Sequence, residues 1–232
     1  MLNALAILAF LAQQDDAAVK EALDRFKQGM KATSPAAQAS AITELSRTPA
    51  EKTLNAIIPL VMDGPKETRI AAAKGLGNFT DYKKKATPAL LAALAAGPNV
   101  REPDVVAAIY EGLGKLADPT SLDTVHKGFR NEQIPVAKAA IACSGAMKQK
   151  ESMDVLIELL KDCQKWLKNK QGGPYKDAKG QNGDDNAVKT RVEDIQKEVI
   201  KAFQTITKEK WTTAMEWELW WSKHKATFEP SK

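Results

Sequence analysis

The stretch from Thr68 to Asp81 reads TRIAAAKGLGNFTD, and 37 residues later Val105–Asp118 reads VVAAIYEGLGKLAD. A third copy, VAKAAIACSGAMKQ at Val136–Gln149, follows after a further 31 residues. The register continues beyond the copies, because the tripeptide SLD at 121–123 recurs 31 residues later as SMD at 152–154. Self-similarity at a period of about 20–50 residues is the signature of repeat architectures. The copies therefore predict a chain built from one repeated unit.

Each copy carries apolar residues on one face of a helix. In the second copy these residues are Val105, Ile109, Leu113 and Leu116, a spacing of i, i+4, i+8 and i+11. A shorter apolar segment precedes each copy, and turn residues such as the Asp-Gly-Pro at 63–65 separate the two. The shorter segments are Leu54–Met62, Pro88–Ala95, Leu122–Phe129 and Met153–Leu167. The unit is therefore a helix A, a turn and a helix B.

Fainter copies lie on both sides of the three clear ones. Ile42 and Leu45 stand where Leu76 and Phe79 stand in the first clear copy. On the other side, Ile195, Phe203 and Ile206 stand where Val105, Leu113 and Leu116 stand. The sequence thus predicts an all-α fold, an α-solenoid of about five helical hairpins with a C-terminal capping helix. Pro59 lies inside one helix A and predicts a kink there.

Composition agrees with helices and argues against several function classes. Aromatic residues make up only 6% of the chain while alanine recurs throughout, which favours helices packed through small side chains over strands. The net charge of +5 comes from 34 basic and 29 acidic residues whose signs are interleaved. A nucleic-acid binder usually concentrates its basic residues on one face. Here the run of three lysines at 83–85 is expected to lie in a single turn.

Residues 56–81, AIIPLVMDGPKETRIAAAKGLGNFTD, resemble the HEAT-repeat (armadillo-like) family in its bacterial form. In such repeats an acidic residue ends helix A and an arginine opens helix B, and Asp63 and Arg69 stand at those places. Later copies depart from this pattern, with Val106 and Ala137 in place of the arginine. The resemblance covers roughly residues 15–210. It implies a fold, and it leaves the activity open.

What the resemblance implies about function is a non-catalytic scaffold that binds another protein on the concave face lined by its B helices. On this register seven side chains project from that face: Lys74, Asn78, Glu111, Lys115, Lys138, Lys197 and Lys201. Such a mildly basic, polar stripe suits a complementary polar surface. No cofactor is expected.

The alternative is a HEAT-like enzyme or a nucleic-acid binder, since alkylpurine DNA glycosylases and phycobilin lyases are HEAT-like families that carry chemistry. A glycosylase of that kind needs aromatic and acidic groups in a basic concave groove, and the predicted B-helix stripe contains no aromatic residue. No nucleophile is placed beside a histidine. Metal binding is not expected, because His126 and His224 are far apart and neither shows ligand spacing with a cysteine.

The two cysteines, Cys143 and Cys163, each fall on an apolar helix face. Helix B of one repeat neighbours helix A of the next, so a disulfide between them is sterically conceivable, and export of the protein would make it plausible. Two buried free thiols are the other interpretation. Both remain open at this point.

Tryptophan is concentrated near the C-terminus, where Trp211, Trp217, Trp220 and Trp221 lie within residues 211–221. Their spacing places Trp217, Trp220 and Trp221 on one broad helical face. The last repeat of a solenoid exposes an apolar side that must be covered, so these residues are expected to form a structural cap. The tail also resembles the tryptophan-rich endings of exported bacterial HEAT-repeat proteins. An aromatic platform for sugars or peptides is the functional alternative.

The chain is predicted to divide into three parts: a signal-like apolar segment at 1–13, a solenoid at 14–210 and a tryptophan-rich cap at 211–232. A secretory signal would place the protein in the periplasm or cell envelope. If the segment is instead an apolar first helix packed on the solenoid, the protein is cytoplasmic. Within the solenoid, the glycines and charges at about 169–187 predict a mobile insertion between helix A and helix B.

Overall fold

The computed structural model describes residues 2–169 and 185–229, with side chains described for residues 16–169 and 186–229. Every regular element among these residues is helical, so the all-α prediction is confirmed. The chain divides into two compact units, residues 1–112 and residues 113–232, and the boundary falls inside helix α7. Much of the predicted insertion at 169–187 lies outside the described residues.

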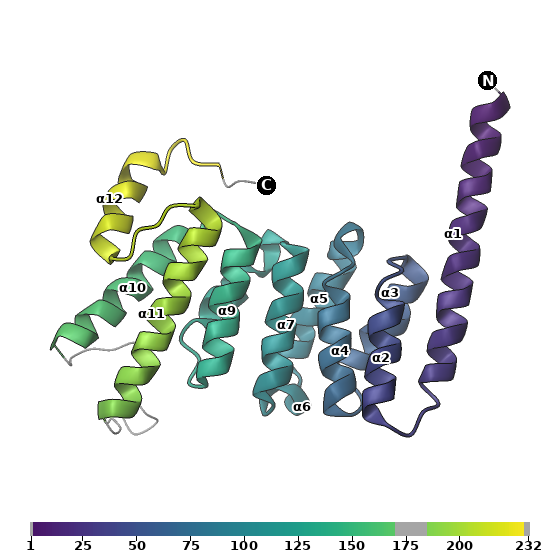
Figure 1. The fold of residues 1–232 in the computed structure, drawn as a ribbon, viewed down its shortest axis with the longest axis horizontal. Coiled ribbons are helices and arrows are strands. Elements are labelled where there is room, and N and C mark those ends of the chain that lie inside the picture. The colour runs from purple at the N-terminus through teal and green to yellow at the C-terminus, as the bar shows by residue number, and fades with distance from the viewer. Residues whose placement is uncertain (1, 170–184, 230–232) are drawn as a thin grey trace. The chain divides into compact units, whose positions relative to one another are not determined.

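The first unit contains two complete hairpins and most of a third (Figure 1). Helices α2, α4 and α7 are its B helices, and α2 and α4 pack side by side. Its elements are α1 (Leu2–Gly29), α2 (Pro35–Leu45), α3 (Glu51–Ile57), η1 (Ile58–Val61), α4 (Lys66–Leu76), η2 (Thr80–Tyr82), α5 (Lys83–Ala95), α6 (Gly97–Val100) and α7 (Pro103–Leu116), where η denotes a 3₁₀ helix.

The second unit holds the remaining two hairpins and a final short helix. Helices α9 and α11 are the B helices and pack against each other, while α12 packs on α10 (Figure 1). Its elements are η3 (Pro119–Ser121), α8 (Leu122–Gly128), α9 (Ile134–Met147), α10 (Ser152–Asn169), α11 (Asp185–Thr207) and α12 (Ala214–His224). The five predicted hairpins are all present, and the fold is an α-solenoid.

Local sequence explains where several helices begin and end. Pro59 does more than kink its helix, because α3 ends at Ile57 and the chain continues through Pro59 as a 3₁₀ helix. The prediction that the lysines at 83–85 lie in a turn is wrong: they form the first turn of α5. That helix starts five residues before the predicted Pro88, so Pro88 lies inside α5 and leaves one backbone carbonyl of its first turn without an i→i−4 hydrogen bond.

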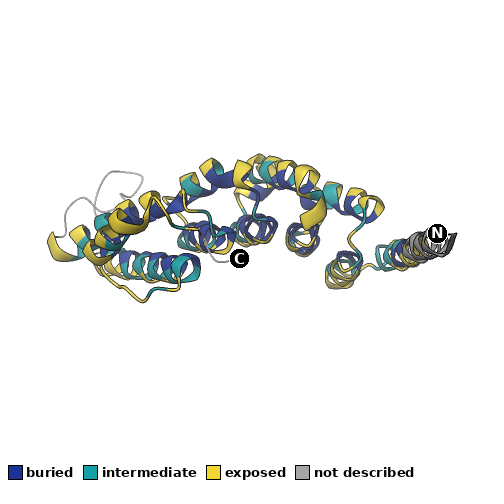
Figure 2. Ribbon diagram, turned by 90° about the horizontal axis from the view of Figure 1, so that it is seen from above, coloured by how far each residue is buried: buried dark blue, intermediate teal, exposed yellow. Residues whose placement is uncertain are grey.

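The repeated apolar positions form the core of each unit. Val105, Ile109 and Leu113 have no exposed surface, and the corresponding residues of α11, Ile195, Val199 and Phe203, are equally buried. In Figure 2 the buried residues lie on the sides of the helices that face other helices of the same unit, and the exposed residues lie on the outer sides. The predicted apolar faces are therefore confirmed.

Glycines allow neighbouring helices of the repeats to approach closely. A Cβ atom added at Gly112 would lie 2.4 Å from the backbone oxygen of Ala73 in α4. In the second unit, a Cβ atom at Gly145 of α9 would lie 3.0 Å from the Cα atom of Ala202 in α11. The repeated Gly-Leu-Gly pattern thus has a packing origin: the missing side chain makes room for the backbone of the preceding or following helix.

A buried polar cluster links the second and third hairpins, with Asn99 at its centre. Arg69 is 7% exposed and donates from Nη1 to the oxygen of Pro98 at 3.0 Å and to Oδ1 of Asn99 at 2.5 Å. Asn99 in turn donates from Nδ2 to the backbone oxygens of Val61, at 3.0 Å, and Ala93, at 2.9 Å. The arginine therefore joins two consecutive repeats, and its side-chain partner is an amide of the next hairpin.

Candidate functional site

The seven side chains predicted to line the B-helix face all lie on B helices or directly after one. Lys74 belongs to α4, Asn78 follows it, and Glu111 belongs to α7 in the first unit. In the second unit Lys115 belongs to α7, Lys138 to α9, and both Lys197 and Lys201 to α11. Six of the seven are exposed and Lys138 is partly exposed.

In the first unit, Lys74 and Glu111 form an ion pair between two neighbouring B helices. Nζ of Lys74 lies 2.9 Å from Oε2 of Glu111, and both side chains are about half exposed, at 49% and 44%. The two residues occupy consecutive repeats, so the pair bridges the surface between α4 and α7. An exposed pair of this kind contributes about 0–1 kcal/mol to stability, and a binding partner can replace it at little cost.

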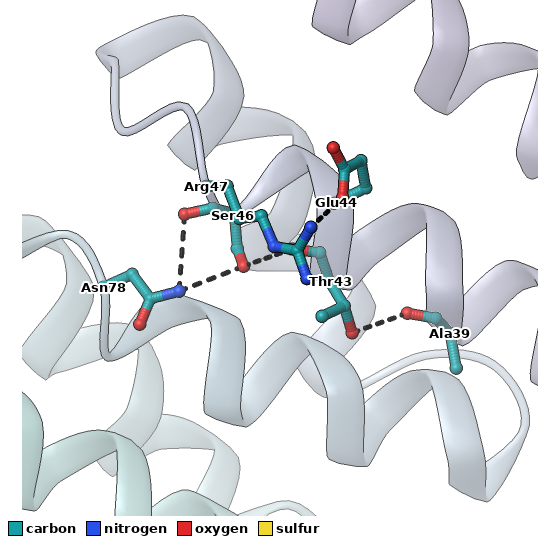
Figure 3. Close-up of polar contacts among 6 residues, drawn as sticks. All are labelled: Ala39, Thr43, Glu44, Ser46, Arg47 and Asn78. Carbon is teal, nitrogen blue, oxygen red and sulfur yellow. Dashed lines mark hydrogen bonds and ion pairs between the residues drawn. The ribbon is translucent and has the colours of Figure 1, made fainter.

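Asn78 has a structural role that the sequence did not reveal. Its Nδ2 donates to Oγ of Ser46 at 3.1 Å and to the Ser46 backbone oxygen at 3.4 Å (Figure 3). The Ser46 hydroxyl donates in turn to the Thr43 backbone oxygen at 2.7 Å. Asn78 therefore ties the end of α4 to the C-terminus of α2, one repeat earlier.

In the second unit, two carboxylates on α11 balance the predicted lysines. Asp194 lies 3.9 Å from Nζ of Lys138 and 4.0 Å from Nζ of Lys197. Glu198 lies 3.7 Å from Nζ of Lys201 and is largely buried, with 15% of its side chain exposed. The i, i+3 spacing of both pairs on α11 could have identified these carboxylates from the sequence.

The B-helix face of the second unit is therefore less basic than its lysines alone suggest. Asp194 and Glu198 offset the charge of Lys197 and Lys201 on α11, and Lys138 shares Asp194 with Lys197. Duplex DNA binding relies on lysines and arginines that neutralise phosphates, and a neighbouring carboxylate opposes that contribution. The exposed faces of α9 and α11 therefore present charges of both signs.

A family model described as HEAT repeats matches residues 23–102 and 99–169, more than half of the chain. The chain belongs to the HEAT-repeat family. HEAT repeats are commonly protein-interaction scaffolds, and the family is generally non-catalytic. No curated protein matches this HEAT-repeat chain.

The tryptophan tail of this HEAT-repeat protein packs on the last hairpin. Trp217 has no exposed surface, and its ring stacks on Phe203 of α11 with centroids 4.5 Å apart. Trp221 is 4% exposed and donates from Nε1 to Oδ1 of Asp154 in α10 at 2.9 Å. Trp220 lies between them and is partly exposed. These contacts support the interpretation of Trp217 and Trp221 as a structural cap.

A capping box fixes the start of the tail helix α12. Thr213 accepts a bond at Oγ1 from the backbone N–H of Glu216, and the Glu216 carboxylate accepts from the backbone N–H of Thr213 at 2.9 Å. Hydrogen bonds from Thr213 lower the pKa of Glu216, so this carboxyl group remains ionised near neutral pH.

Both cysteines are free and buried in the structure. Burial raises the pKa of Cys163 to about 12 and raises the pKa of Cys143 as well. Thiols that stay protonated at neutral pH are poor nucleophiles, so these two side chains belong to the core.

Among the described residues there is no group of three or more His, Cys, Asp or Glu side chains placed to hold a metal ion. None of the described helices combines the length and the hydropathy needed to cross a bilayer.

His126 on α8 gives a testable pH dependence. Burial lowers its pKa, with a smaller opposing effect of Asp123, and its Nε2 lies 2.9 Å from Oγ of Ser152. An unfolded histidine titrates near pH 6.5, so below that pH the unfolded chain binds the proton more tightly than the folded one. Stability attributable to His126 is therefore present above pH 6.5 and lost as the pH falls below it.

We expect the His126→Gln variant to lose less stability than the unmodified protein between pH 7.5 and pH 5.5. Glutamine retains hydrogen-bonding capacity and does not titrate in this range. Urea denaturation of both proteins at the two pH values measures the difference. Equal losses of stability in the two proteins would show that His126 does not couple folding to pH.

Proposed function

We propose that this HEAT-repeat protein is a non-catalytic scaffold that binds another protein through the exposed faces of its B helices. The observation that carries the proposal is that charged side chains of consecutive repeats pair across this face in each unit. Lys74 pairs with Glu111 between α4 and α7, and Lys138 pairs with Asp194 between α9 and α11.

Such pairs suit reversible recognition of a polar protein surface. They hold lysines and carboxylates in set positions, and a partner with complementary charges can exchange them for its own. The exchange costs little, because exposed ion pairs contribute about 0–1 kcal/mol each. A HEAT solenoid adds further contacts repeat by repeat, which turns several weak contacts into useful affinity.

Charge reversal on α11 tests the proposal. The variant Lys197→Glu/Lys201→Glu is expected to fold normally, since both side chains are more than 70% exposed. The matched control, Lys127→Glu/Lys165→Glu, makes the same charge change on the exposed A-helix positions of the same unit. Each protein is used for affinity capture from extracts of the native host, after circular dichroism has shown equal helix content.

We expect the α11 variant to fail to capture a protein that both the unmodified chain and the control capture. Capture of the same protein by all three chains would place its binding surface elsewhere.

A parallel titration with labelled duplex DNA at about 50 and 300 mM salt examines the nucleic-acid alternative. Tight, steeply salt-dependent DNA binding that the α11 variant loses would favour that alternative.

A further inference from the structure

Helix α12 has a second apolar face, opposite the one that covers the last hairpin. Ala214, Trp217 and Trp221 are buried against the unit. Met215 and Leu219, four residues apart, are 72% and 58% exposed. Trp211, in the segment that precedes α12, is 39% exposed. These three are among only five large hydrophobic side chains that are exposed in the described part of the chain.

The outer face of α12 borders a shallow groove of about 240 Å³ with opposite charges at its two ends. Its lining consists of Trp211, Glu216, Leu219, Trp220, Lys223 and His224. Glu216 and Lys223 are seven residues apart, which is about 10.5 Å along a helix. The groove is thus apolar in its middle, acidic toward the start of α12 and basic toward its end.

Both charged groups can accept a further partner. The hydrogen bonds from Thr212 and Thr213 to Glu216 all end on Oε2, so Oε1 can receive a cation. The neighbouring lysines are engaged, Lys161 with Glu218 and Lys225 with Asp154. Lys223, in contrast, has no ion-pair partner among the described residues.

We propose that this face of α12 binds α12 of a second copy of the chain, in an antiparallel pair related by a two-fold axis near Leu219. A two-fold interface must be complementary to itself, because the same patch serves on both sides. The groove meets this requirement: reversing its direction brings Lys223 opposite Glu216 of the second copy. Leu219 lies next to the axis, so its exposed side chain covers Leu219 of the second copy.

The size of the face fixes the expected strength of the pair. Helix α12 has 11 residues and is about 16 Å long, so the pair buries well below the ~1,600 Å² of a standard interface. The dimer therefore forms at high protein concentration and dissociates on dilution. The pair uses no side chain of the B-helix stripe. The tests of the dimer can therefore fail without affecting the proposed function.

Sedimentation equilibrium of the full chain, from about 10 μM to 1 mM, is the first test. We expect a reversible monomer–dimer equilibrium in the unmodified protein. Leu219→Glu should weaken association at least about tenfold, because it places two carboxylates near the axis. Its fold should persist, since Leu219 is exposed. A single monomeric species up to 1 mM would overturn the proposal, as would a dimer that Leu219→Glu leaves unchanged.

A charge-swap experiment tests the antiparallel geometry. Lys223→Glu and Glu216→Lys should each weaken self-association, because each puts like charges opposite one another across the axis. An equimolar mixture of the two variants should restore it, since both pairs between unlike copies again join opposite charges. Failure of the mixture to restore association would overturn the geometry. Glu216→Lys also removes the capping box, so its helix content is compared with that of Glu216→Gln.

A vesicle flotation assay distinguishes the dimer from a membrane-bound helix. Lipid vesicles of phosphatidylcholine with phosphatidylserine are mixed with the full chain at about 10 μM, where the monomer dominates. The proposal predicts that the protein stays in the unbound fraction. Flotation with the vesicles that Leu219→Glu abolishes would mean that the outer face of α12 meets lipid, and would overturn the pairing.

Discussion

Replacing Gly112 with alanine is expected to destabilise the protein strongly. The added Cβ atom would lie 2.4 Å from the Ala73 backbone oxygen and 3.1 Å from Cδ1 of Leu90. A backbone oxygen inside α4 cannot move aside without disturbing the helix, so α4 and α7 must separate. Overpacking typically costs about 1–3 kcal/mol, and contact with backbone places this site at about 3 kcal/mol or more. The melting temperature should fall by about 6–12 °C.

Gly97→Ala is the matched control for this substitution. Apart from its two chain neighbours and the backbone of its own helix, no described heavy atom lies within 4 Å of the Cβ position at Gly97. The residue precedes Pro98, where alanine is mildly disfavoured, so stability should stay within about 1 kcal/mol of the unmodified protein. Thermal denaturation followed by circular dichroism measures both variants. Equal melting temperatures for the two would show that α4 and α7 are not packed through Gly112.

Truncating the buried tryptophans of α12 should have the largest effect of all. Trp217 is fully buried on Phe203, and Trp221 is buried and bonded to Asp154. Removing one buried tryptophan typically costs about 3–5 kcal/mol, so Trp217→Ala/Trp221→Ala should lower the melting temperature markedly or cause aggregation. Coupling in a solenoid runs between neighbouring repeats, so amide protection should fall in α11 before it falls in α4.

Met215→Ala/Leu219→Ala provides the control on the same helix. Both side chains are exposed, so their truncation should leave the melting temperature and the protection of α11 nearly unchanged at low protein concentration. Hydrogen exchange of the two double variants separates the inner face of α12 from the outer. The cap interpretation is wrong if the tryptophan variant keeps its stability and loses binding to sugars or peptides.

The fold could be predicted because the apolar spacing within each repeat identifies the buried face of its helices. The apolar spacing at Val105, Ile109 and Leu113 places one face of α7 in the core, and the same spacing recurs in each B helix. Helix boundaries were predicted less well. The segment at 88–95 was predicted as a helix that begins at Pro88, whereas α5 begins at Lys83. The repeat fixes the spacing of the apolar residues, and local hydrogen bonding fixes where the first and last turns lie.

The polar contacts could be predicted only in part, because they join residues of different repeats. The resemblance marked Arg69, and nothing in the sequence marked Asn99 as its partner 30 residues later. The lysines of α11 were predicted, and Asp194 and Glu198 beside them were overlooked although their spacing was available. The outer face of α12 was also missed, since four tryptophans obscured the stripe of Met215 and Leu219.

Site-specific photo-crosslinking in cells of the native host tests whether the B-helix face of α11 contacts another protein. A photoreactive amino acid replaces Lys201 on the B-helix face of α11 in one protein, and Lys165 on the A-helix α10 in another. We expect a discrete protein adduct from position 201, identified by mass spectrometry, and none from position 165. Adducts from position 165 alone, or adducts from position 201 that contain only nucleic acid, would contradict a protein-binding scaffold that uses its B helices.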